Sequence, residues 1–224
     1  MTKQEQLKGF TLLELLIVIA ILSILAMALI LVLNPAETMK KSRDTQRMTD
    51  LSTVKTAIGL YLTNSTTPAM DMGSNGSCKV GATWVGEESS GKIYYSVPSD
   101  TTDISDMILD GTTFTGTAGA GQVTAANIGL TTGNGWIPVN ISSLAGGSPI
   151  SNFPVDPVNT VTAAGVANSD LVYRYACGDS LTYEIDAKLE STEFGAKAVS
   201  DGGNNPDLYE TGTSLTILGG GTDF

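Results

Sequence analysis

The feature that most constrains this chain is a long apolar run close to its N-terminus. Between Leu15 and Leu33 the one polar residue is Ser23. About 20 apolar residues in a helix cross the hydrocarbon core of a bilayer, so the run is long enough to span a membrane. It is also longer than the roughly 7–15-residue apolar core of a secretory signal peptide. Lys3 and Lys8 precede it, and basic residues stay on the cytoplasmic side, so residues 1–9 are expected inside the cell.

Glu14 is the one ionisable residue between positions 10 and 36. An unpaired carboxylate in an apolar span costs a few kcal/mol. Two interpretations are open: the carboxylate is solvated among lipid headgroups, or it has a cationic partner. No Lys or Arg lies between Lys8 and Lys40. A new α-amino group would serve as the partner if the chain were cut after Gly9.

Residues 9–15 read Gly-Phe-Thr-Leu-Leu-Glu-Leu, and the apolar run follows directly. Over residues 8–33 the chain resembles the class III signal of type IV prepilins, which type IV pilins share with type II secretion pseudopilins. The resemblance implies cleavage between Gly9 and Phe10 by a prepilin peptidase and N-methylation of the new Phe10 amine. It also implies that Glu14 pairs with the Phe10 amine of a neighbouring subunit.

The same resemblance implies a structural subunit of a type IV pilus or a related filament, polymerised through its N-terminal helix, and not an enzyme. Its partners would be other copies of the chain, the prepilin peptidase, an inner-membrane assembly platform and membrane lipid, without direct nucleic-acid contact. The precursor would cross the bacterial inner membrane once with its N-terminus in the cytoplasm, and then enter an extracellular or periplasmic filament. The alternative is a membrane-tethered extracytoplasmic binding domain with an ordinary anchor. Whether the filament is a pilus or a pseudopilus, and whether the chain is a major or a minor subunit, stays open.

Composition excludes several other function classes. The chain has no His, so it has no Ser-His-Asp or Cys-His nucleophile system and no HExxH zinc site. Its net charge of −11 and pI near 4.3 argue against a general nucleic-acid binder, which would present a basic face.

The charge distribution divides the chain near position 64. Residues 1–64 carry seven basic and five acidic residues, whereas residues 65–224 carry five basic and 18 acidic residues. Turn-forming residues at 64–68 mark the boundary. We expect a leader at 1–9, a transmembrane and assembly helix at 10–36, its amphipathic outer half at 37–64, and an extracytoplasmic head at 65–224.

The segment 38–63 has the pattern of an amphipathic helix. Its apolar positions recur every three or four residues, at Met48, Leu51, Val54, Ile58, Tyr61 and Leu62. Its charged residues lie largely off that stripe, at Arg43, Asp44, Arg47, Asp50 and Lys55. These charges form either a solvated helix face or pairs between subunits. With the apolar run it would make one helix from Thr11 to Thr63, about 80 Å long, which Pro35 weakens or kinks.

The head is expected to be rich in β-structure, which gives an α+β fold with a long helix packed on an antiparallel sheet. Residues 181–190 alternate apolar and polar, the pattern of a half-buried strand, and 171–176 pairs with it in a hairpin. Further strands are expected at 92–97 and, more weakly, at 215–218, and a short helix at 140–144. Residues 111–135 read as loop or short strands.

A Pro-x-Asp-Pro segment at 153–159 resembles a turn of the major pseudopilin and its relatives, in which it leads into strands bearing Tyr. Pro154 and Pro157 restrict the backbone, and Asp156 can bond its own turn. The better interpretation is a rigid structural turn.

Two further features of the head bear on its chemistry. Cys78 and Cys177 would face an oxidising compartment, where they form a disulfide or stay as two free thiols. An acidic loop offers oxygen ligands that suit Ca²⁺ from Asp201, Asn204, Asn205, Asp207 and Glu210. Major pseudopilins, which the chain resembles, hold calcium in a C-terminal loop; a solvated turn is the alternative. No other cofactor is expected.

Overall fold

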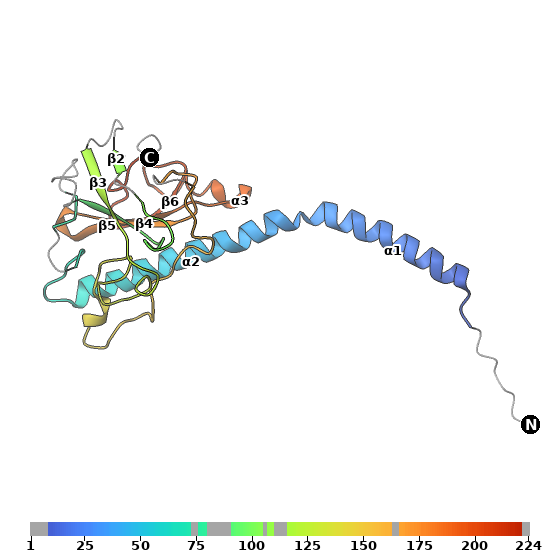
Figure 1. The fold of residues 1–224 in the computed structure, drawn as a ribbon, viewed down its shortest axis with the longest axis horizontal. Helices are drawn as coiled ribbons and strands as arrows, with labels where there is room; N and C mark the ends of the chain where they lie inside the picture. Colours follow the sequence, from blue (N-terminus) through green and yellow to red (C-terminus); the bar gives the residue numbers. More distant parts are fainter. Residues whose placement is uncertain are drawn as a thin grey trace, which may run out of the picture. The chain divides into compact units, whose positions relative to one another are not determined.

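The computed structural model describes residues 9–72, 76–79, 91–104, 107–109, 116–162 and 166–220 (Figure 1). The chain divides into two compact units, residues 1–40 and residues 41–224. The first contains helix α1, Leu12–Leu33. The second contains most of helix α2, Pro35–Asn64, together with the sheet and its loops.

The expected single helix from Thr11 to Thr63 is interrupted at Asn34. The backbone of Asn34 takes the left-handed conformation, with φ 37° and ψ 73°, and this ends α1. A residue that precedes proline is disfavoured in the α conformation, and Asn tolerates the left-handed region better than most residues. Pro35 then occupies the first position of α2, where its missing N–H costs no helical hydrogen bond. Asn34 Oδ1 accepts the N–H of Glu37 at 3.4 Å, so Asn34 also helps to cap α2.

The second unit is built on a mixed six-stranded sheet in the order β2-β3-β1-β4-β5-β6. The strands are β1 Lys92–Tyr95, β2 Met107–Leu109, β3 Gly116–Gly121, β4 Tyr173–Gly178, β5 Thr182–Ala187 and β6 Tyr209–Gly212. Only the β1–β3 pair is parallel among these strands. The expected hairpin is β4–β5, with Tyr173 opposite Ala187 and the 3₁₀ turn Asp179–Leu181 between the strands. A second 3₁₀ turn spans Ile141–Ser143, and the short helix α3 spans Thr192–Gly195.

The strand expected at 215–218 is absent, and β6 takes the edge of the sheet instead. The backbone N–H groups of Ile217 and Leu218 donate to the Glu184 carboxylate at 2.7 and 2.9 Å. These two donors therefore bond a side chain, and the segment lies across the sheet without joining it.

Both faces of the sheet are covered. On one face α2 contributes Leu51, Val54 and Ile58 to a core that includes Trp136 and Tyr175. The core on the opposite face is formed by strand residues and by the C-terminal segment, with Ile93, Tyr95, Val97, Val172, Ala176, Ile217 and Leu218 among its members. The prediction that residues 181–190 form a half-buried strand is therefore wrong for β5, because the polar residues Glu184 and Asp186 are buried as well.

Candidate functional site

The N-terminal end of α1 is closed by a reciprocal capping box. Thr11 is the N-cap, and its hydroxyl oxygen accepts the N–H of Glu14 at 3.2 Å. The Glu14 carboxylate reaches back and accepts from the Thr11 N–H and the Thr11 hydroxyl, each at 2.9 Å. A Thr followed three residues later by Glu folds locally in this way, since each side chain satisfies a backbone N–H of the first helical turn. Both donors to the carboxylate are neutral, so its charge has no cationic partner within this motif.

The cleavage site expected from the sequence lies just before this cap. A Cβ atom added at Gly9 would meet no atom within 4 Å, so the fold itself does not require glycine there. Phe10 is 87% exposed. The described part of the chain has one helix that is long and apolar enough to cross a membrane, over Leu12–Ile30, with mean hydropathy 2.9 and none of the span buried.

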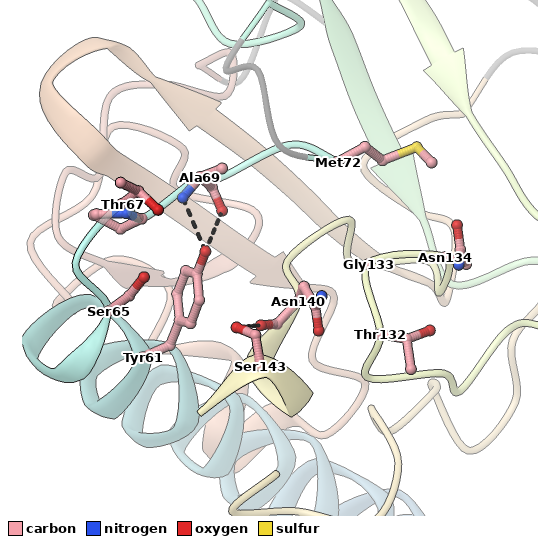
Figure 2. Close-up of a pocket in the computed structure, with 11 residues that line it drawn as sticks. Tyr61, Ser65, Thr67, Ala69, Met72, Thr132, Gly133, Asn134, Asn140 and Ser143 are labelled. Carbon is pink, nitrogen blue, oxygen red and sulfur yellow. Dashed lines mark hydrogen bonds between the residues drawn. The ribbon is translucent and has the colours of Figure 1, made fainter. Parts of the chain in front are cut away.

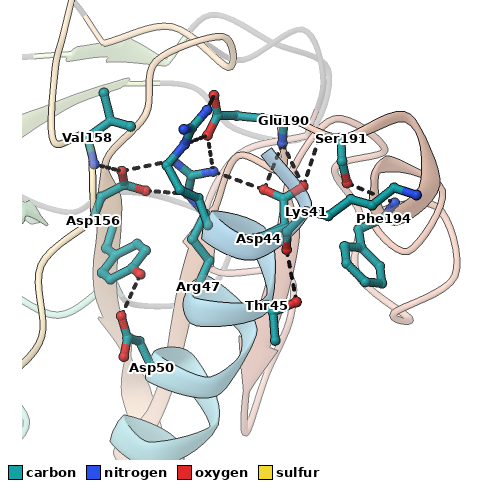
Figure 3. Close-up of polar contacts among 12 residues, drawn as sticks. Lys41, Asp44, Thr45, Arg47, Asp50, Asp156, Val158, Glu190, Ser191 and Phe194 are labelled. Carbon is teal, nitrogen blue, oxygen red and sulfur yellow. Dashed lines mark hydrogen bonds and ion pairs between the residues drawn. The ribbon is translucent and has the colours of Figure 1, made fainter. Parts of the chain in front are cut away.

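The head carries a buried ionic cluster that fastens α2 to two loops, and we call it the Arg47 clamp (Figure 3). Arg47 is fully buried and donates through Nε and Nη2 to the two carboxylate oxygens of Asp156, at 2.6 and 3.0 Å. Its Nη1 donates to Asp44 at 2.9 Å and to Glu190 at 2.6 Å. Arg43 adds a two-bonded pair with Glu190, at 2.7 and 2.8 Å. The planar guanidinium group suits this arrangement, because its five N–H donors form a fixed fork.

Asp44 completes the clamp from the helix side. Its carboxylate accepts the backbone N–H of Glu190 at 2.9 Å and that of Ser191 at 2.7 Å. Ser191 in turn caps α3, since its hydroxyl accepts the N–H of Phe194. Helix α2 is therefore tied to the backbone of the 190–191 loop as well as to its side chains.

The Pro-x-Asp-Pro turn connects the clamp to the sheet. Asp156 Oδ1 accepts the N–H groups of Val158 and Asn159 at 2.8 and 3.1 Å, as expected for a rigid turn. The Asn159 amide bonds the hydroxyl and carbonyl of Ser96 at 2.6 and 2.9 Å. Ser96 Oγ accepts the N–H of Tyr173, and the Tyr173 hydroxyl donates to Asp50 on α2 at 2.9 Å. A continuous path of hydrogen bonds thus leaves the helix and returns to it.

The clamp keeps its charges because each carboxylate meets a guanidinium group. Hydrogen bonds from Arg43 and then Arg47 lower the pKa of Glu190 to about 2, against the opposing effect of its burial. Burial alone would lower the pKa of Arg47, but hydrogen bonding and attraction to Asp156, Glu190 and Asp44 raise it. Glu190 and Arg47 are therefore ionised at neutral pH. Breaking a single pair of the clamp would leave a buried charge without a partner.

The charged residues of this helix were expected to form a solvated face or pairs between subunits. Neither expectation holds for Asp44 and Arg47. Both side chains are fully buried and paired within the chain. A sequence signal for this exists: positions 44 and 47 continue the apolar stripe of 51, 54, 58 and 61 toward the N-terminus. Charged residues on the buried stripe of a helix need partners, and their identity was not readable from the helix alone.

The opposite face of the sheet holds a second group of buried acids. In the β5–β6 register Asp186 lies opposite Glu210, and Glu184 lies two residues along β5 on the same face, opposite Gly212. Asp186 pairs with Arg174 at 3.0 Å. Burial, followed by contact with Glu210, raises the pKa of Glu184, and burial also raises the pKa of Glu210. These acids hold the C-terminal segment through the Glu184 bonds to Ile217 and Leu218.

Cys78 and Cys177 are joined by a disulfide, with their Cα atoms 4.6 Å apart. Cys177 lies in β4, and Lys79 forms a parallel bridge with Gly178. The disulfide therefore pins the segment 76–79 to the hairpin, across a sequence separation of 99 residues.

The five residues expected to bind calcium are only partly brought together. Asp201 accepts the N–H groups of Gly203 and Glu210 at 2.9 and 2.7 Å. The Asn205 side chain accepts the N–H of Asp207 and donates to the carbonyl of Gly219, while its own N–H donates to Glu210.

The other two residues of that set have different surroundings. With its amide nitrogen turned toward Glu210, Asn204 donates to Glu210 Oε1 at 3.1 Å and to the Leu215 carbonyl at 3.2 Å. The Asp207 side chain is 53% exposed and lies 3.8 Å from Lys188. Within the described ranges no three His, Cys, Asp or Glu side chains gather in a metal-holding group. Calcium at this loop stays a prediction, tested by melting the protein with excess Ca²⁺ and with a chelator.

Comparison with known families places the capping box inside a recognised motif. A family model described as the prokaryotic N-terminal methylation motif matches residues 8–30. The comparison with curated proteins found no match, and neither did the comparison with solved structures. The match supports a pilin-like precursor processed by prepilin peptidase and a pilus-type assembly, and the apolar helix fits a membrane-anchored precursor. The chain thus carries, at its N-terminus, the class III signal of type IV pilins and pseudopilins.

Proposed function

We propose that this protein is a structural subunit of a type IV pilus or a related filament, cleaved after Gly9 and polymerised through α1. The precursor spans the inner membrane once with its N-terminus in the cytoplasm, and the head lies outside. Its partners in this role are the prepilin peptidase, the inner-membrane assembly platform and other copies of the chain. The role is structural and involves no catalysis.

The observation that carries the proposal is Glu14 at the start of an otherwise apolar helix. Its carboxylate accepts two hydrogen bonds from Thr11, which satisfy part of its capacity and leave its charge uncompensated. Cleavage after Gly9 would create an α-amino group on Phe10, at the same level of the helix. In a bundle of parallel α1 helices the amine of one copy can neutralise the Glu14 of the next, which lowers the cost of burying both charges.

Gly9 supports the same reading from its surroundings. No described atom lies within 4 Å of a Cβ built at this position, so the described part of the fold supplies no reason for glycine there. A peptidase that must admit the backbone on the N-terminal side of Phe10 would supply one.

The head fits a structural role because it is fixed firmly to its helix. The Arg47 clamp joins α2 to the 156 and 190 loops, and the disulfide joins segment 76–79 to β4. Helix α2 and the head would therefore enter a filament as one body. A disulfide also suits the oxidising side of the membrane.

The test is intact-mass and N-terminal peptide analysis of the protein extracted from membranes and filaments of its native host. A chain that begins at N-methylated Phe10 is expected. A chain that keeps Met1–Gly9, or that is cut beyond Leu33, would contradict the proposal and leave the alternative of a tethered extracytoplasmic domain.

A pair of variants separates processing from assembly. Glu14→Ala is expected to insert in the membrane and fold its head, yet to be missing from sheared filaments. Glu37→Ala, which removes a carboxylate beyond the apolar helix, is the matched control and is expected to assemble. Equal filament yield from the two variants would refute the role of Glu14.

A further inference from the structure

The described lining of the hollow beside the C-terminal end of α2 is uncharged and polar (Figure 2). The hollow measures about 460 Å³ and is lined by two chain segments, residues 61–72 and residues 132–143. Lys, Arg, Asp and Glu are all missing from its described lining. A site without charged groups does not favour an ionic ligand. An ion that enters it loses part of its hydration, and no opposite charge in the site offsets that cost.

Hydrogen-bonding side chains that are open or partly open to solvent gather around this hollow. The hydroxyls of Ser65, Thr67 and Thr132 and the amides of Asn134 and Asn140 line it and bond to no other described residue. Each amide offers two donors and two acceptor sites, and each hydroxyl can donate and accept. Such groups match a ligand that itself carries several hydroxyls. Pro68, Ala69 and Met72 add an apolar contribution at one side, where the C–H face of such a ligand can rest.

The walls of the hollow are held in place before any ligand arrives. The Tyr61 hydroxyl bonds the backbone of Ala69 as acceptor at 2.9 Å and as donor at 3.3 Å. The N–H of Met72 donates to the Pro138 carbonyl at 2.7 Å, which joins the two walls. Thr132 pairs with Asn140 in an antiparallel bridge, and Gly133 between them has φ +89°, which suits glycine. Preorganised walls reduce the entropy that binding must overcome.

A second hollow of about 450 Å³ shares Met72, Gly133 and Asn134 with the first. It continues past Asn134 toward Tyr94 and Lys92. The two together give room for more than one ring of a ligand, with the uncharged hollow as the primary position.

We propose that the uncharged hollow between segments 61–72 and 132–143 binds a neutral saccharide unit through the side chains of Asn134 and Asn140. The ring hydroxyls bond these amides and the hydroxyl of Thr132, and the C–H face contacts Met72. The site is open and largely polar, so affinity is weak, with a Kd on the order of 1 mM for a single ring.

The test is saturation-transfer NMR on the full chain in a detergent that contains no sugar. The probes are the methyl glycosides of glucose, galactose and N-acetylglucosamine, with methyl glucuronide as the charged counterpart. Transfer to at least one neutral glycoside, stronger than to the glucuronide, is expected. No transfer to any of the three at 10 mM (roughly tenfold above the expected Kd), or preferential transfer to the glucuronide, would overturn the proposal.

Variants connect the signal to the hollow. Asn134→Ala with Asn140→Ala removes both amides from exposed positions, so folding is preserved, and binding is expected to weaken about tenfold or more. Asn152→Ala, an exposed Asn outside both hollows, is the control and should bind as the parent does. Equal transfer in the double variant would place the saccharide elsewhere and refute this site. The same sugars immobilised on a slide show whether the site also accepts a surface-bound glycan, which would support it further.

Discussion

At the scale of single residues, Arg47 shows how a charge is kept inside a small head. Its side chain is fully buried, yet its donors meet oxygens of Asp156, Asp44 and Glu190. Two of these partners lie more than 100 residues away along the chain. Removing one member of a buried ion pair leaves its partner as an unpaired buried charge. The stability lost in this way is larger than the stability lost when both members are replaced by apolar residues. Arg47 is therefore a residue on which the attachment of α2 depends.

Arg47→Ala is expected to destabilise the head by about 3–5 kcal/mol, because the buried Asp44 and Asp156 would lose their guanidinium partner. Arg43→Ala is the comparison: its side chain is 29% exposed and its pair with Glu190 is solvent-screened, so a loss of about 1 kcal/mol or less is expected. Urea unfolding monitored by Trp fluorescence measures both. Equal losses for the two variants would contradict the buried character of the clamp.

The depressed pKa of Glu190, about 2, gives the clamp a direction of pH dependence. The unfolded chain binds a proton at Glu near its ordinary pKa, whereas the folded chain resists protonation. The contribution of Glu190 is therefore fully present above the ordinary Glu pKa and is lost as the pH falls toward 2. The melting temperature of the parent should fall further between pH 6 and pH 3 than that of Glu190→Gln. A parallel fall in the two proteins would show that Glu190 does not carry this dependence.

At the scale of elements, the β4–β5 hairpin connects several parts of the fold. It pairs with β1 and β6, carries residues of both cores, and bears Cys177 of the disulfide. The segment 76–79 reaches the hairpin through that disulfide and through the bridge from Lys79. The alternation in the sequence located the hairpin correctly, but it suggested a solvated face that does not exist. The C-terminal segment covers that face, and no local pattern announces where such a segment will lie.

Replacing Cys78 and Cys177 together by Ser is expected to destabilise the head by about 2–4 kcal/mol, since the unfolded chain would regain the freedom of a long loop. The measurement is the thermal midpoint of the double variant against the parent, both without reductant. As a control, reductant should lower the midpoint of the parent and leave the variant unchanged. A variant as stable as the oxidised parent would show that the disulfide adds nothing to the packing.

At the scale of the whole molecule, the two compact units differ in what stabilises them. Residues 41–224 contain both apolar cores, the disulfide and the Arg47 clamp. The apolar helix α1 buries none of its Leu12–Ile30 window against the described residues, and its length and hydropathy fit a membrane span. The head should therefore fold without α1.

A fragment of residues 41–224 is expected to be soluble and to show the near-ultraviolet circular dichroism of the intact head. A fragment of residues 48–224 is the matched control: it lacks Arg43, Asp44 and Arg47, so Asp156 and Glu190 lose their partners. It should melt at a clearly lower temperature. If the longer fragment aggregates, or if the two melt alike, the head is not an independent unit held together by its clamp.

The sequence by itself determined the features that depend on neighbouring residues. A continuous apolar run predicts a helix long enough to cross a membrane, and Gly9, Phe10 and Glu14 lie within residues 8–30, which match the N-terminal methylation motif. Alternation along 181–190 located a strand, because the side chains of a strand point to opposite faces in turn. These signals are local, so no knowledge of the chain path is needed to read them.

Only the tertiary structure decided which distant residues meet. Arg47 and Asp156 are 109 residues apart, and nothing near either residue specifies the other. Likewise, the C-terminal segment covers the second face of the sheet by donating two N–H groups to Glu184. The interruption of the helix was predicted only in part: Pro35 indicated a weak point, but the sequence did not predict the left-handed conformation of Asn34. Periodicity records which side of an element is buried, whereas the partner of a buried charge depends on how the loops return, and that is set by the packing of the whole head.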